Sequence, residues 1–261
     1  MAVDTKLIQQ LRQITGAGIS DCKKALEETD NDVEAAIEAL RKKGLAKSAS
    51  REVGSQGTVA LAVDGNRAAL AEIKSETDFV AASDEFKAFV ADIANLVLAK
   101  GEDAIAERQK EIEDLKIKLK EGIAVGTIAR IEAGAGNVLG TYLHEQGGRG
   151  VNGVIVELSG SNADQAKEVA LHISFAKPRY LKRDDVPADV VAKERALLEE
   201  QTKLEGKPEA ALPKIVEGKL NGFFKEICLL EQGYVRDDKQ SIKQFLGGGD
   251  VVRFAQAYIT A

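Results

Sequence analysis

A glycine-rich corner that leads at once into an amphipathic segment stands near the start of the chain, at residues 15–26 (TGAGISDCKKAL). Gly16 and Gly18 favour turn conformations with positive φ, so a helix before the corner cannot easily continue through it. Apolar residues then return at helical spacing from Ile19 to Leu26. The segment predicts two short helices packed across a tight turn. The apolar edge that this leaves around Ile19 is typical of a docking surface rather than of a reaction centre.

The first part of the chain predicts a module of three short helices, of which the corner joins the first two. Its outer helices carry apolar residues at helical spacing: Leu7, Ile8, Leu11 and Ile14, then Val33, Ala36, Ile37 and Leu40. Asn31 and Glu34 have the spacing of a capping box at the start of the third helix, and Gly44 is placed to end it. The small and polar residues 45–56 are typical of a linker. We therefore expect a three-helix domain with its linker over residues 1–54.

The period of the apolar pattern changes after the linker. Alternating apolar residues from Val59 predict a strand, and the Asp64-Gly65 pair predicts a hairpin turn into a second strand. A helix with an apolar face is expected from about Ser83. Residues 55–137 therefore predict a first core subdomain of the ββα type.

A second unit with the same order of elements is predicted further along. Strands are expected over residues 138–145 and 151–158, separated by a glycine-rich turn, and Ser161 is placed to cap the helix that follows. This second core subdomain spans residues 138–261. The expected fold class is α+β, with helices packed on antiparallel sheets.

The segments around these units are less regular. The charge-dense residues 102–121 predict a mostly solvated helix, and the Gly- and Ala-rich residues 122–137 carry no clear pattern. Residues 187–228 predict an inserted antiparallel helical hairpin, which breaks at Gly206 and Pro208.

The composition limits the classes of protein to which the chain can belong. A length of 261 residues suits two or three compact units, and a net charge of −6 disfavours direct nucleic-acid binding. The sequence has no apolar run long enough to cross a membrane and no signal-peptide pattern at its start. Cys22 and Cys228 suggest no disulfide framework. We expect a cytoplasmic protein.

The usual signatures of catalysis are absent from the sequence. It has no phosphate-binding glycine loop, no GxSxG, no HExxH and no CxxC pair. His144 and His172 are the only histidines, and no metal-ligand spacing surrounds them. The sequence therefore predicts no covalent chemistry, no cofactor and no metal site.

The segment Thr77-Asp78-Phe79-Val80, which follows the second strand, allows two interpretations. Asp78 can cap the next helix and Phe79 can belong to the core, and the pattern alone favours this structural interpretation. The functional alternative is an exposed Asp-Phe prong. Its ring would wedge between elements of a partner, beside a charge that perturbs a metal ion or a hydrogen bond there.

Three motifs, in this order, resemble the bacterial elongation factor Ts family, the guanine nucleotide exchange factors of the GTPase elongation factor Tu. They are TGAGISDCKKALEET near the start, SETDFVA at residues 75–81, and ALPKIVEGKLNGFF with the following LLEQ in the return arm of the hairpin. The resemblance covers nearly the whole chain. It implies an N-terminal module similar to ubiquitin-associated domains, a coiled-coil hairpin, and a heterodimer or higher complex with elongation factor Tu.

The resemblance also implies site residues. Leu11 and Ile19 match positions that contact the partner's nucleotide-binding domain, and His144 matches a histidine near the partner's phosphate loop. Residues 77–80 match the segment that displaces Mg²⁺ from the partner and so promotes GDP release and GTP exchange. Ser20 departs from the family, in which an apolar side chain is common at this position, and this weakens the expected docking edge.

Three other functions remain open at this stage. A ubiquitin-associated-type adaptor that binds a polypeptide without exchange activity explains the first module but leaves the SETDFV segment unused. An enzyme that uses Asp78 with His144 requires a closed pocket that holds both. A ribosome- or RNA-binding factor is disfavoured by the acidic net charge.

Overall fold

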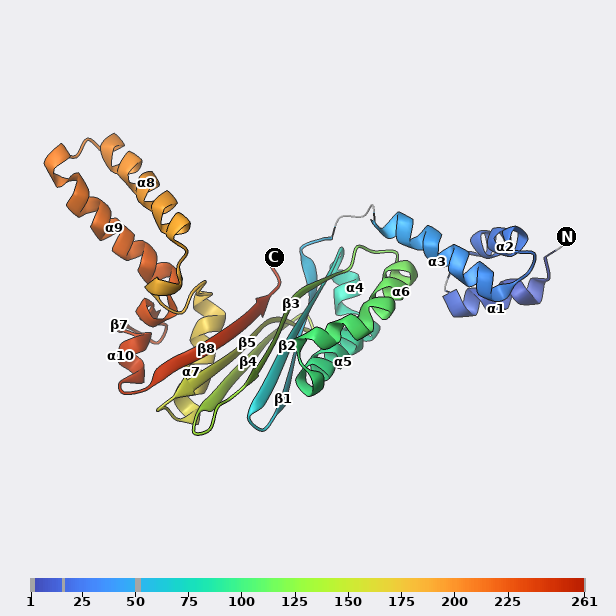
Figure 1. Ribbon diagram of the computed structural model, residues 1–261, viewed down its shortest axis with the longest axis horizontal. Helices are drawn as coiled ribbons and strands as arrows, with labels where there is room; N and C mark the ends of the chain where they lie inside the picture. The colour runs from blue at the N-terminus through green and yellow to red at the C-terminus, as the bar shows by residue number, and fades with distance from the viewer. Residues whose placement is uncertain (1–2, 16, 50–52, 261) are drawn as a thin grey trace.

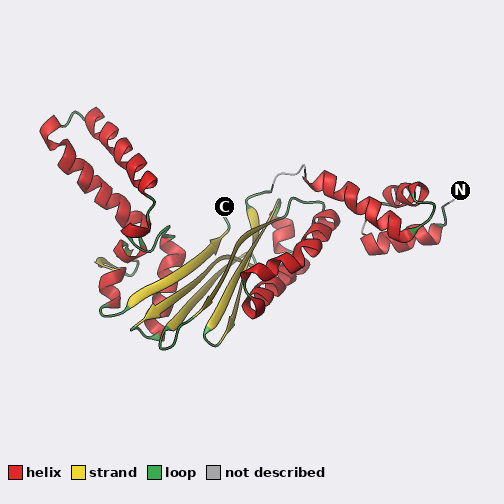
Figure 2. Ribbon diagram, viewed as in Figure 1, coloured by secondary structure: helices red, strands yellow, loops and turns green. Residues whose placement is uncertain are grey.

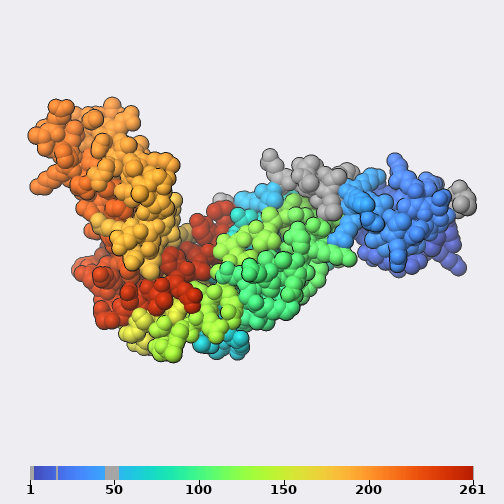
Figure 3. Space-filling model, viewed as in Figure 1, coloured from blue at the N-terminus to red at the C-terminus, as the bar shows by residue number. Residues whose placement is uncertain are grey.

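The computed structural model describes residues 3–15, 17–49 and 53–260. A small helical module lies at one end, a core of β-sheets and helices in the middle, and a helical hairpin projects at the other end (Figure 1). The long strands gather in the core (Figure 2), and the space-filling view shows the module and the hairpin as separate lobes (Figure 3). The mixed fold class expected from the sequence is confirmed.

The N-terminal module consists of α1 (Thr5–Thr15), α2 (Ile19–Glu28) and α3 (Val33–Ala49), so the predicted three-helix arrangement is confirmed. Its buried core comes from all three helices: Leu11, Cys22, Ala25, Leu26, Ala36 and Leu40. Ile14, expected on the same stripe as Leu11, is instead 56% exposed. The stripe is narrower than the sequence suggests, because α2 and α3 cover only the inner side of α1.

Two predictions at the N-terminal ends of α2 and α3 are wrong. Gly18 has a φ of −65° with extended ψ, so it precedes α2 without the positive φ expected of it, while Gly16 lies outside the described residues. The side chain that caps α3 belongs to Asp32, whose Oδ1 accepts a hydrogen bond from the Ala35 N–H at 3.0 Å. Asn31 cannot cap the helix, since it adopts a left-handed conformation with a φ of +66°.

The first core subdomain is a three-stranded antiparallel sheet in the order β1-β2-β3, with helices on one face. Its elements are β1 (Gln56–Asp64), β2 (Arg67–Ser75), α4 (Asp78–Ala82), α5 (Asp84–Lys100), η1 (Glu102–Arg108), α6 (Gln109–Leu119) and β3 (Ala124–Glu132). The predicted hairpin is present, but Gly65 and Asn66 form its turn, one residue later than expected. Helix α5 begins next to Ser83, where the sequence predicts a helix start, and Ser83 caps it: its Oγ accepts from the Phe86 N–H at 3.3 Å. Strand β3 arises from the segment that carries no clear sequence pattern.

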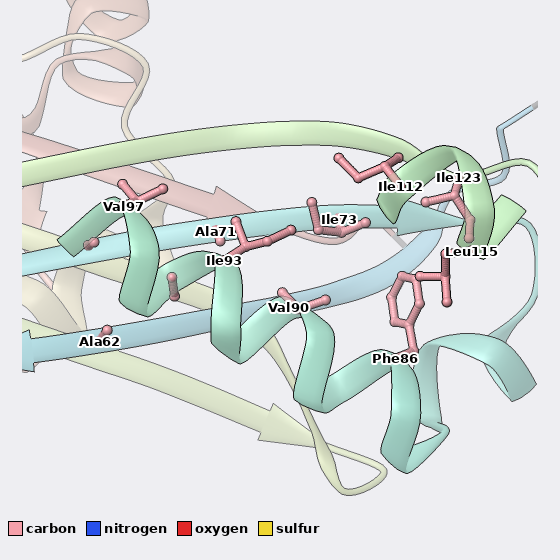
Figure 4. Packing of buried hydrophobic residues seen from close by; sticks show 12 residues of the cluster. Ala62, Ala71, Ile73, Phe86, Val90, Ile93, Val97, Ile112, Leu115 and Ile123 are labelled. Carbon is pink, nitrogen blue, oxygen red and sulfur yellow. The ribbon is translucent and has the colours of Figure 1, made fainter. Parts of the chain in front are cut away.

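An apolar layer joins α5 to this sheet (Figure 4). Phe86, Val90 and Ile93 of α5 pack against Ile73 of β2 in one fully buried cluster. Leu115 of α6, together with Ile112, closes one end of this layer in Figure 4. The start of α5 is therefore fixed by packing, which matters for the turn that precedes it.

Helix α3 continues past Gly44, which was expected to end it. A Cβ atom at Gly44 would lie 2.8 Å from Ile117 Cγ1 of α6, so the glycine allows the two helices to approach closely. Arg41 adds ion pairs across this contact, at 3.5 Å to Glu113 and 3.3 Å to Asp114. The module therefore rests on α6. The expected linker is helical as far as residue 49, and its residues 50–52 lie outside the described residues.

The second core subdomain repeats this arrangement with the strand order β4-β5-β8. Its elements are β4 (Val138–Gln146), β5 (Arg149–Ser159), α7 (Ala163–Ala176) and β8 (Asp250–Tyr258). The predicted strand-strand-helix order is confirmed, and β8 from the end of the chain completes the sheet. Asn162 caps α7 rather than Ser161: its side chain accepts from the Gln165 N–H at 2.9 Å.

The two sheets pack face to face, with α5 and α7 on their outer faces. Residues of both sheets form the layer between them: Val59, Ala68, Leu70, Ile131, Ile155 and Ala257. Gly150 permits the close approach, because a Cβ atom there would lie 2.1 Å from the Val59 carbonyl oxygen. Strand β2 is buried along almost its whole length, as expected for a strand covered on both faces.

The predicted helical hairpin is confirmed as α8 (Ala188–Leu204) and α9 (Leu212–Ile227). Its core contains Leu198, Val216, Leu220 and Phe224. The remaining short elements lie before, within or after it: η2 (Arg183–Asp185), η3 (Glu209–Ala211), η4 (Leu229–Glu231), β6 (Gly233–Tyr234), β7 (Asp237–Ser241) and α10 (Ile242–Leu246).

Glu157 of β5 is a buried carboxylate that ties this subdomain together. Its Oε1 accepts from the Gly134 N–H at 2.8 Å and from Asn137 Nδ2 at 2.7 Å, and its Oε2 accepts from Arg253 Nε at 2.7 Å. Burial favours a higher pKa, but the hydrogen bonds from Asn137, Gly134 and Arg253 outweigh it and lower the pKa of Glu157 below its usual value. The ionised form is therefore the one that the fold stabilises.

We expect Glu157→Gln to lower the free energy of unfolding by about 1–3 kcal/mol at pH 7, because the amide cannot accept all of these bonds. A folded-state pKa below the unfolded value stabilises the fold above the unfolded pKa, and this stabilisation is lost as the pH falls through the folded one. The difference in free energy of unfolding between wild type and Glu157→Gln should therefore narrow below about pH 4. Urea denaturation at a series of pH values measures it, with the exposed Glu145→Gln as control. Equal stability of Glu157→Gln and wild type at pH 7 would refute this account.

Candidate functional site

A single turn of helix, α4, lies between the end of β2 and the start of α5. Thr77 caps it, with its Oγ1 accepting from the Val80 N–H at 3.3 Å. Ala81 is fully buried and Val80 packs partly on the α5 cluster, so this side of the turn faces the core. Phe79 faces the other way and is 84% exposed.

The structure excludes the structural interpretation of this segment. Phe79 lies outside the apolar core, and Thr77 rather than Asp78 provides the cap. Asp78 is exposed in the first turn, where a negative charge is favourable at a helix N-terminus. The structural interpretation is wrong for both residues, and the pair is displayed to solvent as a prong.

Side chains from distant parts of the sequence hold the backbone of this turn. Glu121, between α6 and β3, accepts hydrogen bonds from the hydroxyl and the N–H of Thr77, the latter at 3.1 Å. Thr58 of β1 donates to the Ala81 carbonyl at 2.7 Å, and Arg149 of β5 donates to the Asp78 carbonyl at 3.0 Å. Sequence reasoning missed these roles. Glu121 ends a charge-dense run, and Arg149 lies in a segment that was expected to be only a turn.

The β-hairpin of β4 and β5, which carries His144, lies against this turn. Arg149 joins the hairpin to the Asp78 carbonyl, and Lys87 of α5 donates to the Gly148 carbonyl at 3.3 Å. His144 of β4 is exposed and stacks on Tyr142, with ring centroids 6.4 Å apart. The structure thus brings the strand of His144 to the same end of the core as the prong.

The two predicted docking residues of the module differ sharply in exposure. Ile19, the first residue of α2, is 57% exposed. Ile14, near the end of α1, is 56% exposed. Leu11 is fully buried in the core of the module, so the expectation that it contacts a partner directly is corrected. Its side chain supports the helices that present Ile19.

The second histidine has a structural environment. His172 of α7 is 1% exposed, and its Nδ1 accepts from the Val235 N–H at 3.3 Å. This assigns the proton to Nε2, which donates to Gln232 Oε1 at 3.0 Å. Burial lowers the pKa of His172, which outweighs the opposite effect of the Gln232 hydrogen bond. The neutral ring is a packing residue of the second subdomain.

The geometry gives no support to an enzyme that uses Asp78 with His144. Both side chains are exposed rather than enclosed in a pocket. Over residues 3–15, 17–49 and 53–260, no cluster of three or more His, Cys, Asp or Glu side chains could hold a metal ion. In the same residues, no helix has both the length and the apolar character needed to cross a membrane.

Comparisons with known proteins match nearly the whole chain. The family model described as elongation factor TS matches residues 76–258, and a UBA-like domain model matches residues 2–44. The elongation factor Ts of Alkalilimnicola ehrlichii is 41% identical over 272 residues, covering 98% of this chain and 91% of the relative. Those of Clavibacter michiganensis subsp. michiganensis and Clavibacter sepedonicus are each 42% identical over 270 residues, covering 97% of both chains. With a helical module, two matching sheet subdomains and a helical hairpin in this order, the chain belongs to the elongation factor Ts family of translation elongation factors.

Proposed function

We propose that this chain is a guanine nucleotide exchange factor. It binds the GDP-bound form of elongation factor Tu, displaces Mg²⁺ and promotes GDP release and GTP exchange, without covalent chemistry. The observation that carries the proposal is the exposure of Phe79, at 84% of its surface. Leaving such a ring in water forgoes about 1.5–3 kcal/mol of burial, and the fold holds it there with a capped turn.

The prong supplies the exchange activity. GDP binding by a GTPase depends on Mg²⁺, which bridges the protein and the phosphates. The ring of Phe79 makes its wedge contact only in an opened form of the partner. Asp78 beside it disfavours the Mg²⁺-loaded geometry or the hydrogen bonds that hold it. Because binding linkage is reciprocal, a factor that prefers the nucleotide-free partner must weaken nucleotide binding by the same ratio.

Docking is the task of other residues. Ile19 offers an exposed apolar edge on the N-terminal module. His144 lies on the hairpin of β4 and β5 that packs beside the prong. Its proposed task is to lie near the partner's phosphate loop. Leu11 contributes only through the packing of the module.

A polypeptide-binding adaptor without exchange activity is the alternative, and the match of residues 2–44 to a UBA-like domain is the observation in its favour. Elongation factor Tu loaded with a fluorescent GDP distinguishes the two in a stopped-flow experiment. An exchange factor accelerates GDP release in proportion to its concentration until the partner is saturated. Binding without acceleration would establish the adaptor and overturn the proposal.

A further inference from the structure

Helix α4, which carries the prong, is too short to define its own shape. It has five residues, Asp78–Ala82, and an isolated helix of that length is not stable in water. The direction of the Phe79 ring therefore depends on what holds the turn from outside. Three side chains from distant parts of the sequence do so: Glu121, Thr58 and Arg149.

Glu121 holds the turn at its beginning. Its carboxylate is 7% exposed, and both of its oxygens are used by Thr77, one by the hydroxyl and one by the backbone N–H. Thr77 Oγ1 in turn accepts from the Val80 N–H, so the cap is oriented by the carboxylate behind it. Lys120, with a φ of +57°, ends α6 in a left-handed turn just before Glu121.

The other two contacts hold the turn beyond its cap residue, Thr77. Thr58 holds the Ala81 carbonyl at the far end, at 2.7 Å. Arg149 holds the Asp78 carbonyl, and its own position is fixed by Gln56 Oε1 at 2.7 Å from Nη2. Without Glu121, the Thr77 N–H would remain without this partner and the Thr77 hydroxyl would be free to rotate away from the Val80 N–H.

We propose that Glu121 is a positioning residue for exchange: it fixes the cap of α4 and so aims Phe79 and Asp78 at the partner. The inference rests on the proposed function for its activity readout. Glu121 does not touch the partner in this account, since its carboxylate is buried behind Thr77. Its effect on GDP release therefore acts through the orientation of the Phe79 ring.

The orientation can be measured without the partner. The chain contains no tryptophan, so Phe79→Trp introduces a single indole at the prong, which can be excited at wavelengths that the four tyrosines of the chain do not absorb. In the Phe79→Trp protein that keeps Glu121, we expect the fluorescence anisotropy of this indole to decay with the tumbling of the whole molecule. Glu121→Ala should add a fast nanosecond component. Glu111→Ala is the matched control and should add none, since Glu111 of α6 is exposed and pairs with Arg108 rather than with Thr77.

The activity test is a double-mutant cycle on fluorescent GDP release from elongation factor Tu. Glu121→Ala should lower the maximal release rate about tenfold or more, because a misplaced group loses most of its effect. It should change the concentration at half-maximal rate much less. In a protein that already carries Phe79→Ala, Glu121→Ala should lower the maximal release rate little further, since both substitutions remove the same interaction. Glu121→Gln, which keeps one acceptor oxygen, should recover part of the rate.

Two results would overturn the proposal. One is an unchanged anisotropy decay in Glu121→Ala. The other is an equal loss of rate from Glu121→Ala with and without Phe79, which would indicate a general structural role. Circular dichroism verifies that each variant folds, and Glu121→Gln carries the test if the alanine variant does not. If wild type fails to accelerate GDP release, the proposed function fails, while the anisotropy result still decides the positioning of the prong.

Discussion

Replacing Phe79 with alanine is expected to lower the maximal rate of GDP release from elongation factor Tu by about 30-fold. Truncating an aromatic side chain at the centre of a contact costs about 2 kcal/mol or more, and about 1.4 kcal/mol corresponds to a factor of ten. The affinity for the GDP-bound partner should change little, because the wedge contact exists only in the opened form. Stopped-flow release of a fluorescent GDP at saturating factor measures the rate, and titration measures the affinity.

The fold itself should not suffer from this substitution. Phe79 is 84% exposed, so its removal leaves no cavity, and surface changes of this kind alter stability by about 0.5 kcal/mol at most. Leu204→Ala is a matched control, since Leu204 is 83% exposed at the end of α8, in the projecting hairpin (Figure 1). A wild-type release rate in Phe79→Ala would remove the prong from the mechanism.

Ile19→Asp is expected to have the opposite kinetic signature. It should raise the factor concentration at half-maximal rate by about tenfold or more, because burial of an isoleucine side chain at an interface contributes about 1.5–3 kcal/mol. The maximal rate should stay near that of wild type, since the prong is intact. An aspartate at the first position of α2 suits the helix N-terminus, so the module should remain folded.

Ile19→Leu keeps the apolar surface and serves as the control. It should bind almost as wild type does. A lower maximal rate in Ile19→Asp with an unchanged half-maximal concentration would contradict the separation of docking from exchange. The two variants together therefore assign the two tasks to two parts of the chain.

Local patterns were enough to predict most of the elements. Helices α1 and α2, the hairpin of β1 and β2, the ββα order of the second unit and the helical hairpin all depend on periodicity and turn residues close in sequence. The start of α5 near Ser83 is of the same kind. These features do not depend on how distant segments pack.

The errors arose where distant segments decide. Helix α3 runs through Gly44 because α6 packs against it there. No sequence pattern near Gly44 predicts its contact with Ile117 of α6. Leu11 and Ile14 look alike on one stripe, yet of the two only Leu11 is fully buried in the core of the module. Strand β3 takes its place by pairing with β2, which compensates for its weak pattern.

The candidate site divides in the same way. The sequence alone identified the Asp78-Phe79 pair, but its spacing could not decide whether the ring is buried. Glu121 and Arg149 were not foreseen as its supports, because they are 44 and 71 residues away from the groups that they bind. A prong in a short turn can be recognised locally, whereas the contacts that aim it come from tertiary structure.

The affinity of this chain for nucleotide-free and for GDP-bound elongation factor Tu, compared by isothermal titration calorimetry, tests the central claim most directly. An exchange factor must bind the nucleotide-free form more tightly by the factor through which it weakens GDP binding, and we expect a ratio of about 100. Phe79→Ala should reduce that ratio by weakening the nucleotide-free complex alone. Equal affinity of the wild-type chain for the two forms would contradict the account.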